Sequence, residues 1–229
     1  LILEDTPEVI MAATMGNPAV KGPDRGLYRS SNSGTTWDHV LLPSDSAGVN
    51  DLAYDSSTGI MIAAGWNRLR NSTRSLVLGP ESKLYRSDDS GITWASVNNP
   101  WGNANRCRIG LSENNGDFYA LVVGLNMQLD NIYKSSDGGV SWLPIISDTS
   151  PLANALGGFG WYFSKIRVNP WNSNDITVLG VDAWNSLDGG DTWSLLTPVW
   201  WEYSVHADKH DLQWIGPNSA ILATDGGAY

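Results

Sequence analysis

The sequence predicts an all-β protein, a β-propeller of four-stranded antiparallel blades that forms an incomplete arc of a larger ring. A motif of the form Ser-x-[Asp/Asn]-x-Gly-x-[Ser/Thr]-Trp occurs four times, at residues 30–37, 87–94, 135–142 and 186–193. Its tryptophans fall 57, 48 and 51 residues apart, and a unit of that period without helical patterning is typical of stacked β units. The 24 glycines and 12 tryptophans, with only 17% charged residues, suit many short strands joined by tight turns.

Each copy of the motif is predicted to close a β-hairpin. A short apolar and aromatic segment precedes it, such as Leu84-Tyr85-Arg86, and a second strand begins at the motif tryptophan. The Asp or Asn accepts hydrogen bonds from turn amides, Gly takes a positive φ, and Trp folds back as an apolar lid. A catalytic or calcium-binding role is the alternative, but four near-identical copies argue against four active sites. The residues assigned this structural role are Asn32, Gly34, Trp37, Asp89, Gly91, Trp94, Asp137, Gly139, Trp142, Asp188, Gly190 and Trp193.

These hairpins resemble the Asp-box, or bacterial neuraminidase repeat, of sialidases, xyloglucanase-type glycoside hydrolases and sortilin-type propellers. Four further segments resemble the sortilin-type propellers of large secreted bacterial proteins, many of which are exported by the type IX system. These segments are Phe159–Tyr162, Val168–Asn174, Val205–His210 and Ala223–Gly227. The resemblance implies a secreted or cell-surface protein, and it identifies a fold more firmly than an activity.

The motif positions predict the other strands in order. In the second blade we expect strands at 49–55, 60–65, 83–86 and 93–97, with a tight turn at Ser57-Thr58-Gly59. The first two strands of the later blades are expected at 106–111 and 118–123, at 164–170 and 175–180, and at 210–214 and 220–225. The first blade is expected to contain a strand at 9–13, with residues 1–5 as the tail of an innermost strand.

The chain is therefore expected to be one propeller segment, residues 1–229. Its expected bounds are a partial blade at 1–45, blades at about 46–100, 101–150 and 151–200, and a partial blade at 201–229. An open arc exposes sheet faces and edges, which soluble proteins avoid. We expect the remaining blades of the same protein, or a second copy, to close the ring. The absence of a Met and of a basic segment at Leu1 indicates a mature product or a fragment.

The composition of the chain excludes some classes of binding partner. The net charge of -10 and the pI near 4.5 argue against nucleic acid or an anionic membrane as partner. No apolar run approaches the ~20 residues of a membrane span. Cys107 is the only cysteine, so an internal disulfide is excluded, and we expect it to be a buried, unreactive residue. No cofactor is predicted.

The segment His206-Ala207-Asp208-Lys209-His210 is the main candidate for chemistry. If it is a strand, its two histidines and Asp208 share one face and could hold a divalent metal or form an acid/base pair. The alternative is that these residues only order a blade junction. A glycoside hydrolase would need a pair of carboxylates near the channel, with Asp51 and Asp208 as candidates. A sialidase is disfavoured, because no Arg-Ile-Pro segment occurs.

Loops at the channel mouth are the expected binding surface, because long loops on a rigid scaffold commonly carry specificity. The residues expected to contact a ligand are Trp66, Arg108, Tyr162, Trp200, Trp201 and Asp225. We interpret the chain as a non-catalytic, extracellular module that binds a polypeptide or a polysaccharide. The alternatives are a glycoside hydrolase and a structural segment of a surface assembly.

Overall fold

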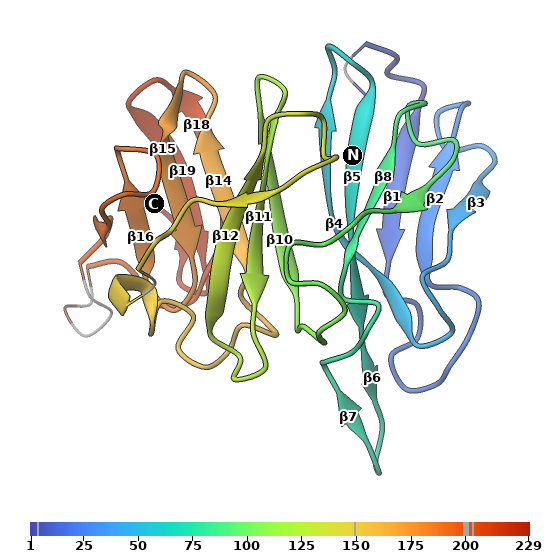
Figure 1. Cartoon of the computed structure of the whole chain (residues 1–229), viewed down its shortest axis with the longest axis horizontal. Helices are drawn as coiled ribbons and strands as arrows, with labels where there is room; N and C mark the ends of the chain where they lie inside the picture. Colours follow the sequence, from blue (N-terminus) through green and yellow to red (C-terminus); the bar gives the residue numbers. More distant parts are fainter. Residues whose placement is uncertain (4, 149, 199–201, 203) are drawn as a thin grey trace.

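Antiparallel sheets stand side by side in an open fan in the structure, a computed structural model that describes residues 1–3, 5–148, 150–198, 202 and 204–229 (Figure 1). The first sheet contains β1 (Ile10–Thr14), β2 (Gly26–Ser30) and β3 (Asp38–Leu41). The second contains β4 (Ala47–Asp55), β5 (Ile60–Asn67), β8 (Leu84–Ser87) and β9 (Ala95–Ser96), and a small hairpin, β6 (Leu69–Arg70) with β7 (Ser75–Leu76), projects from β5.

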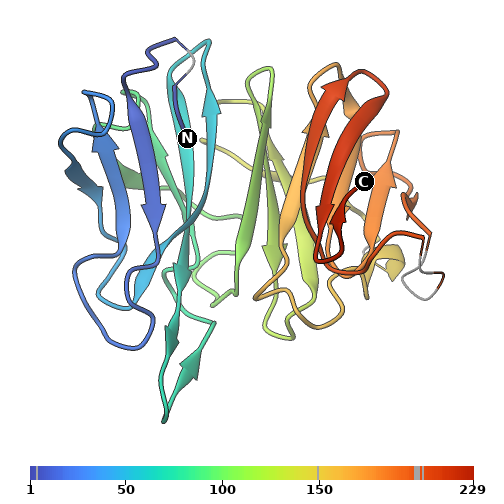
Figure 2. The same ribbon diagram turned by 180° about the vertical axis from the view of Figure 1, so that it is seen from behind.

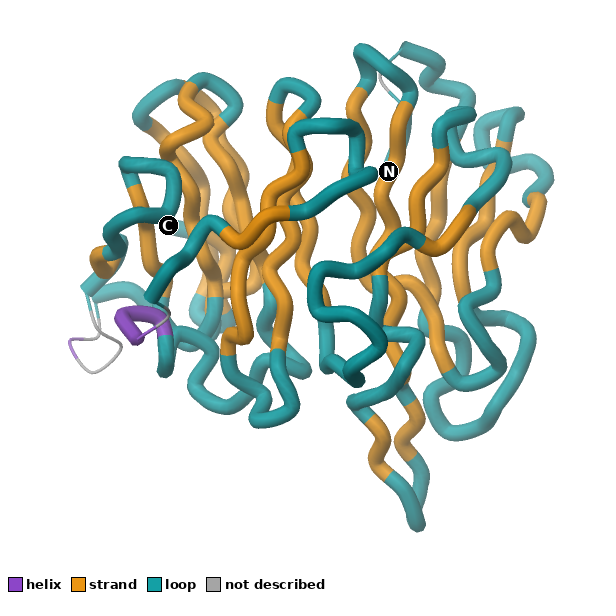
Figure 3. Tube along the Cα trace, in the orientation of Figure 1, coloured by secondary structure: helices purple, strands orange, loops and turns teal. Residues whose placement is uncertain are grey.

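The remaining sheets repeat this order across the fan. The third contains β10 (Ile109–Asn114), β11 (Asp117–Val123), β12 (Leu129–Ser135) and β13 (Leu143–Pro144). The fourth contains β14 (Lys165–Asn169), β15 (Asn172–Leu179), β16 (Ala183–Ser186) and β17 (Ser194–Leu195). The last contains β18 (Lys209–Gly216), β19 (Ser219–Thr224) and β20 (Gly227–Ala228), and a short 3-10 turn, η1 (Ser150–Leu152), lies between β13 and β14 (Figure 3). The all-β prediction is confirmed.

Apolar side chains fill the spaces between neighbouring sheets. The residues of β11 after Asp117 are all buried, because sheets pack on both of its faces. A two-sided burial of this kind requires a continuous apolar run instead of the alternation seen in half-exposed strands. Four clusters of buried residues follow the fan, one between each pair of neighbouring sheets. Each cluster therefore joins two sheets, and no single core joins them all.

The inner strands of neighbouring sheets contact one another in chain order: β1 with β4, β4 with β10, β10 with β14, and β14 with β18. Side chains also cross these contacts. The Asn50 amide donates to the carbonyl of Ile109 at 2.8 Å, and the Arg167 guanidinium donates to the carbonyl of Leu111 at 3.3 Å. In the view from behind, the first and the last sheet lie at opposite ends of this series (Figure 2). The first residues of β4, β10, β14 and β18 are thereby brought to one end of the fan, and the last residue of β1, Thr14, lies beside the start of β4.

One sequence-based prediction differs from the observed strands. Residues 106–111 were expected to form an innermost strand, whereas β10 runs from Ile109 to Asn114, with Gly110 packed against the backbone of the next sheet. This error comes from extending a regular pattern into a segment where the chain is still entering the sheet. Residues 1–5 were expected to be the tail of an innermost strand, and the backbones of Leu1 and Leu3 hydrogen-bond to Met11 and Val9 beside β1, on either side of a bridge between Ile2 and Ile10.

Each box hairpin is held by the same set of hydrogen bonds. In the hairpin at 87–94, Asp89 accepts from the Thr93 amide at 2.8 Å and the Thr93 hydroxyl at 2.6 Å, and Ser87 donates to it at 2.7 Å. Gly91 has φ 81°, and its carbonyl accepts from the Trp94 indole N–H at 3.1 Å. The hairpins also connect sheets, because the guanidinium of Arg86 donates to the carbonyl of Gly138 in the next hairpin at 2.6 Å. These contacts describe a turn that is complete without a metal or a ligand.

The box carboxylates predict a loss of stability in acid. Hydrogen bonds from the Ser141 side chain and amide lower the pKa of Asp137 to about 2, and those from Thr192 do the same for Asp188. A carboxylate whose pKa is lower in the folded chain stabilises it above the unfolded value near 3.9, and this contribution is lost as pH falls toward 2. We expect the urea midpoint to fall between pH 4.5 and pH 2.5, and to fall less in Asp137→Asn.

The hairpin at 30–37 provides the matched control for this prediction. Asn32 occupies the carboxylate position, its side-chain oxygen accepts from the Thr36 amide at 2.9 Å, and its amide donates to the Thr36 hydroxyl at 2.8 Å. This hairpin therefore has the same bonds without a titrating group. Asn32→Asp should steepen the pH dependence that Asp137→Asn flattens, and equal pH profiles for the two variants would contradict the assignment.

No helix among the described residues has the length and apolar character required to cross a bilayer. Cys107 is fully buried, and burial raises the pKa of its thiol to about 11, so it stays protonated and unreactive at neutral pH.

Candidate functional site at the mouth of the fan

A cavity of about 230 Å³ lies where the innermost strands begin. Its lining residues are Arg108, Tyr162, Phe163, Lys165, Lys209 and His210. Lys165 is the first residue of β14, Lys209 and His210 are the first two of β18, and Arg108 directly precedes β10. The β6–β7 hairpin projects at the same end, because Asn67 at the end of β5 pairs with Ala47 at the start of β4.

The Asp51 carboxylate is fully engaged beside this cavity. Its two oxygens lie 3.0 and 3.1 Å from the ammonium of Lys165, and it also accepts from the backbone amide of Leu111 at 3.0 Å. Its side chain is 12% exposed. Asp51 was predicted as a catalytic candidate, and in the structure its carboxylate ties β4 to β10 and β14.

Two basic side chains of the cavity lie away from bulk water: Lys209 is buried and Arg108 is half-buried. Lys209 has 0% exposure and donates to the carbonyl of Val181 at 2.9 Å, while Asp182 lies 3.8 Å away. Burial lowers the pKa of Lys209, with attraction by Asp182 opposing this. Burial likewise lowers the pKa of Arg108, whose guanidinium donates to the carbonyl of Tyr162 at 2.5 Å. The cavity therefore carries positive charge at a site where water solvates it poorly.

His210 forms a hydrogen-bonded pair with Asp225. The imidazole Nε2 and the carboxylate Oδ1 are 2.5 Å apart, and the two side chains are 34% and 49% exposed. The imidazole packs edge-on against the Tyr162 ring at 5.4 Å and lies 5.4 Å from the Phe163 ring. Asp225 was expected to be a ligand contact, and the structure places it at the rim of the cavity through this histidine.

A second cavity, of about 450 Å³, opens at the same end. Its lining residues are Arg68, Arg70, Ser75, Val77, Met127, Gly158 and Trp161. The guanidinium of Arg68 lies 5.5 Å from the centre of the Trp161 ring. Trp161 and Tyr162 are 5.5 Å apart, so a single short segment lines both cavities. We name the surface formed by Arg68, Arg108, Trp161, Tyr162 and His210 the mouth face.

The predicted metal cluster is not assembled. Strand β18 begins at Lys209, and Asp208 before it has a positive φ of 64°, so the alternation argument for residues 206, 208 and 210 is wrong. His206 is exposed, and its Nδ1 contacts the carbonyl of Ala207. Among the described residues, no three His, Cys, Asp or Glu side chains converge in a way that would hold a metal ion.

Trp66 does not offer a free stacking surface. It lies within β5 and not in a loop, is 7% exposed, and donates to the carbonyl of Val77 at 2.9 Å. The guanidinium groups of Arg68 and Arg108 lie 5.6 and 5.5 Å from the centre of its ring. Trp66 thus supports the two arginines of the mouth face instead of contacting a ligand itself. The predicted contacts Trp200 and Trp201 lie outside the described residues.

Sequence reasoning missed Lys165, Lys209 and Trp161 as members of this site. Lys165 directly precedes Ile166 as Arg108 directly precedes Ile109, so the two bases hold matching places at the start of their strands. Lys209 was visible inside the histidine segment, but its complete burial has no sequence signal.

We compared the sequence and the fold with those of known proteins. No model of a known protein family matches the chain. The xyloglucanase Xgh74A of Acetivibrio thermocellus is 25% identical over 208 residues, which cover 80% of this chain and 23% of that protein. A xyloglucanase of a Paenibacillus species is 24% identical over 207 residues, covering 80% of this chain and 19% of that protein. The chain thus spans about a quarter or less of the length of these relatives.

Solved structures agree with this likeness. The GH74 xyloglucanase of Xanthomonas campestris superposes over 99% of this chain and 35% of its own, with a TM-score of 0.63 and 15% identity. A GH74 enzyme of Niastella koreensis gives a TM-score of 0.58 with 17% identity, over 99% of this chain and 35% of its own. The chain folds as a β-propeller segment and is similar to parts of these GH74 proteins. The predicted fold, an incomplete arc of antiparallel blades, is confirmed.

Proposed function

We propose that this propeller segment binds a polysaccharide across the mouth face, as part of a larger extracellular or cell-surface protein. The observation that supports this most directly is the continuous aromatic and arginine surface that joins two cavities at one end of the sheets. Tyr162 is 49% exposed, and Phe159, in the same loop, is 51% exposed. Exposed aromatic rings stack on the apolar faces of sugars, and guanidinium groups donate to hydroxyls.

The relatives support a glycan as the ligand class, because they are named xyloglucanases. A sortilin-type relationship and export by the type IX system belong to the same proposal, since both rest on the sequence segments around the boxes. A polypeptide ligand is the alternative that the binding experiment separates, because it would leave every polysaccharide unbound.

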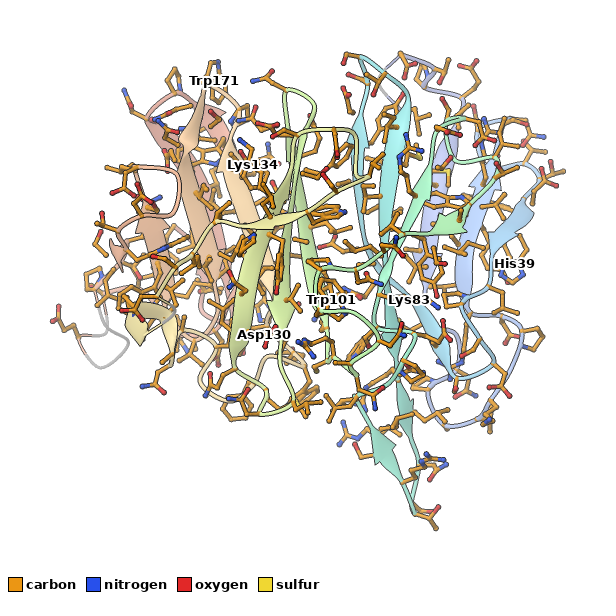
Figure 4. The ribbon with its side chains drawn as sticks, in the orientation of Figure 1. His39, Lys83, Trp101, Asp130, Lys134 and Trp171 are labelled. Carbon is orange, nitrogen blue, oxygen red and sulfur yellow. The ribbon has the colours of Figure 1, made fainter. Side chains whose placement is uncertain are left out.

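Affinity electrophoresis in gels that contain xyloglucan or another polysaccharide tests the proposal. We expect Trp161→Ala to weaken binding by about 30-fold, equivalent to ~2 kcal/mol, because it removes a ring that lines the larger cavity and contacts Tyr162 of the smaller one. Trp171→Ala is the matched control. Trp171 is 56% exposed and lies at the opposite end of the sheets (Figure 4), so its loss should leave migration unchanged. Retardation that survives Trp161→Ala in a folded variant would refute the mouth face as the binding surface.

Glycoside hydrolysis is the second candidate function. The specific observation in its favour is the Asp225 carboxylate, which is half exposed at the cavity rim and bonded to His210, in a chain whose relatives are named xyloglucanases. Incubating the protein with the same polysaccharides, and measuring the reducing ends released, decides between the two functions. Release of reducing ends that is lost in Asp225→Asn would establish hydrolysis, whereas retention without release would leave binding alone. The partner carboxylate in this proposal is one of the predicted candidates Asp51, which is paired with Lys165, and Asp208, which lies in the turn before β18.

A further inference from the structure

The smaller cavity is basic, whereas the chain as a whole is acidic. The sequence has 14 Lys and Arg against 24 Asp and Glu, which gives a net charge of -10. Four of the cavity's lining residues are nevertheless bases, namely Arg108, Lys165, Lys209 and His210, and no acidic residue lines it among the described part of the chain. A local excess of positive charge in a low-dielectric recess attracts anions more strongly than the same charges in water.

Of these four bases, Arg108 is the one without a carboxylate partner among the described contacts, and its guanidinium lies over the ring of Trp66. Lys165 is neutralised by Asp51 at 3.0 Å and His210 is bonded to Asp225 at 2.5 Å. Lys209 has a weaker partner, Asp182, at 3.8 Å. The described hydrogen bonds and ion pairs of Arg108 include no carboxylate. Its Nη1 contacts only a backbone carbonyl, and its Nε is buried without a hydrogen-bond partner in the described structure.

An unpaired buried donor on a charged group is costly, and a bound anion would offset that cost. Removing a guanidinium from water without an acceptor for its N–H groups destabilises the free protein. Asp51 attracts Arg108, but its oxygens are already bonded to Lys165 and to a backbone amide. A bound anion would supply a further acceptor to this half-buried guanidinium.

We propose that the cavity receives the carboxylate of a uronic acid residue in an acidic polysaccharide, with Arg108 as its main partner. This inference rests on the proposed function. The planar guanidinium fork matches a planar carboxylate, and the rings of Tyr162 and Phe163 provide a wall for the sugar. A volume of about 230 Å³ is below the ~300–1,000 Å³ of pockets for drug-sized ligands, which suits one sugar residue. Neighbouring sugars would follow the aromatic segment toward Trp161 and Arg68.

The test compares polygalacturonate with its carboxyl-reduced, neutral counterpart, both as polymers and as trimers, by affinity electrophoresis and calorimetry. We expect the wild-type chain to bind the acidic form at least tenfold more tightly, and added salt to weaken only that form. Arg108→Gln should lower affinity for the acidic form by about 10- to 100-fold, because it removes a charge-assisted hydrogen bond, and should change the neutral form little. Trp171→Ala is the folded control with wild-type affinity.

The outcomes separate this inference from the proposed function. Equal affinity for the acidic and neutral forms would overturn the inference and leave polysaccharide binding intact, whereas no binding to any polysaccharide would overturn the proposed function itself. Equally tight binding of poly-glutamate would show that the site selects carboxylates without a sugar, which also overturns the inference. If melting curves show that Arg108→Gln is misfolded, Arg108→Lys serves instead. It keeps the charge but lacks the fork, and unchanged affinity in that variant would contradict a guanidinium-specific contact.

Discussion

Replacing Gly110 with alanine is expected to lower the free energy of unfolding by about 3 kcal/mol, and the melting temperature by roughly 6–12 °C. Gly110 lies in β10, and a Cβ on it would overlap the backbone carbonyl of Ser164, just before the neighbouring innermost strand. The obstruction is backbone and cannot rotate away, so two sheets must separate. Thermal unfolding followed by circular dichroism measures the effect.

Gly102 is the control for this substitution. It has a φ of 64° and open space around the position of a Cβ, so Gly102→Ala has only the cost of a left-handed backbone, about 1 kcal/mol. Equal melting temperatures for the two alanine variants would mean that the strands beside Gly110 are packed more loosely than described.

Replacing Lys165 with methionine should destabilise the chain by about 2–3 kcal/mol. The change removes the ammonium that binds both oxygens of Asp51 and leaves a carboxylate that is 12% exposed without its countercharge. Removing one partner of a buried pair costs about 3–5 kcal/mol, and the partial exposure of Lys165 reduces that figure. Urea unfolding at neutral pH measures the loss.

Two further variants test the cause. Lys165→Met combined with Asp51→Asn should recover at least ~1 kcal/mol of the lost free energy of unfolding, because the second change removes the carboxylate that was left without a cation. The pair Lys21–Asp45, whose side chains are 58% and 56% exposed, is the matched surface control, and Lys21→Met should change stability by less than ~0.5 kcal/mol. A double variant as unstable as Lys165→Met alone would contradict the electrostatic explanation.

The fold could be predicted from the sequence because its signal is local and repeated. Each box turn needs a carboxylate or amide, a glycine with positive φ and a tryptophan within eight residues. All four copies carry these residue types at the same spacing. The residues at which strands begin were predicted less accurately. The start of β10 depends on where Gly110 meets the next sheet, and that contact joins residues far apart in the chain.

The site could be predicted only in part, because burial and pairing decide its chemistry. The sequence identified Arg108, Tyr162 and Asp225, since each follows or precedes a recognisable strand. It misplaced Asp208, because β18 begins only at Lys209, after the left-handed backbone at Asp208, so strand alternation does not apply to residues 206–208. It also could not reveal that Trp66 supports arginines from a buried position, because the indole is covered by side chains from other segments.

Because each apolar cluster joins only two adjacent sheets, stability along the fan is a chain of nearest-neighbour terms, as in repeat proteins. The cluster between the fourth and last sheets is the smallest, with Leu179, Ala183, Leu212 and Leu222 as its buried members. Among the described residues, the apolar contact between these two sheets is therefore the weakest of the four. Since β18 carries Lys209 and His210, a ligand that contacts β10, β14 and β18 together would stabilise this interface when it binds.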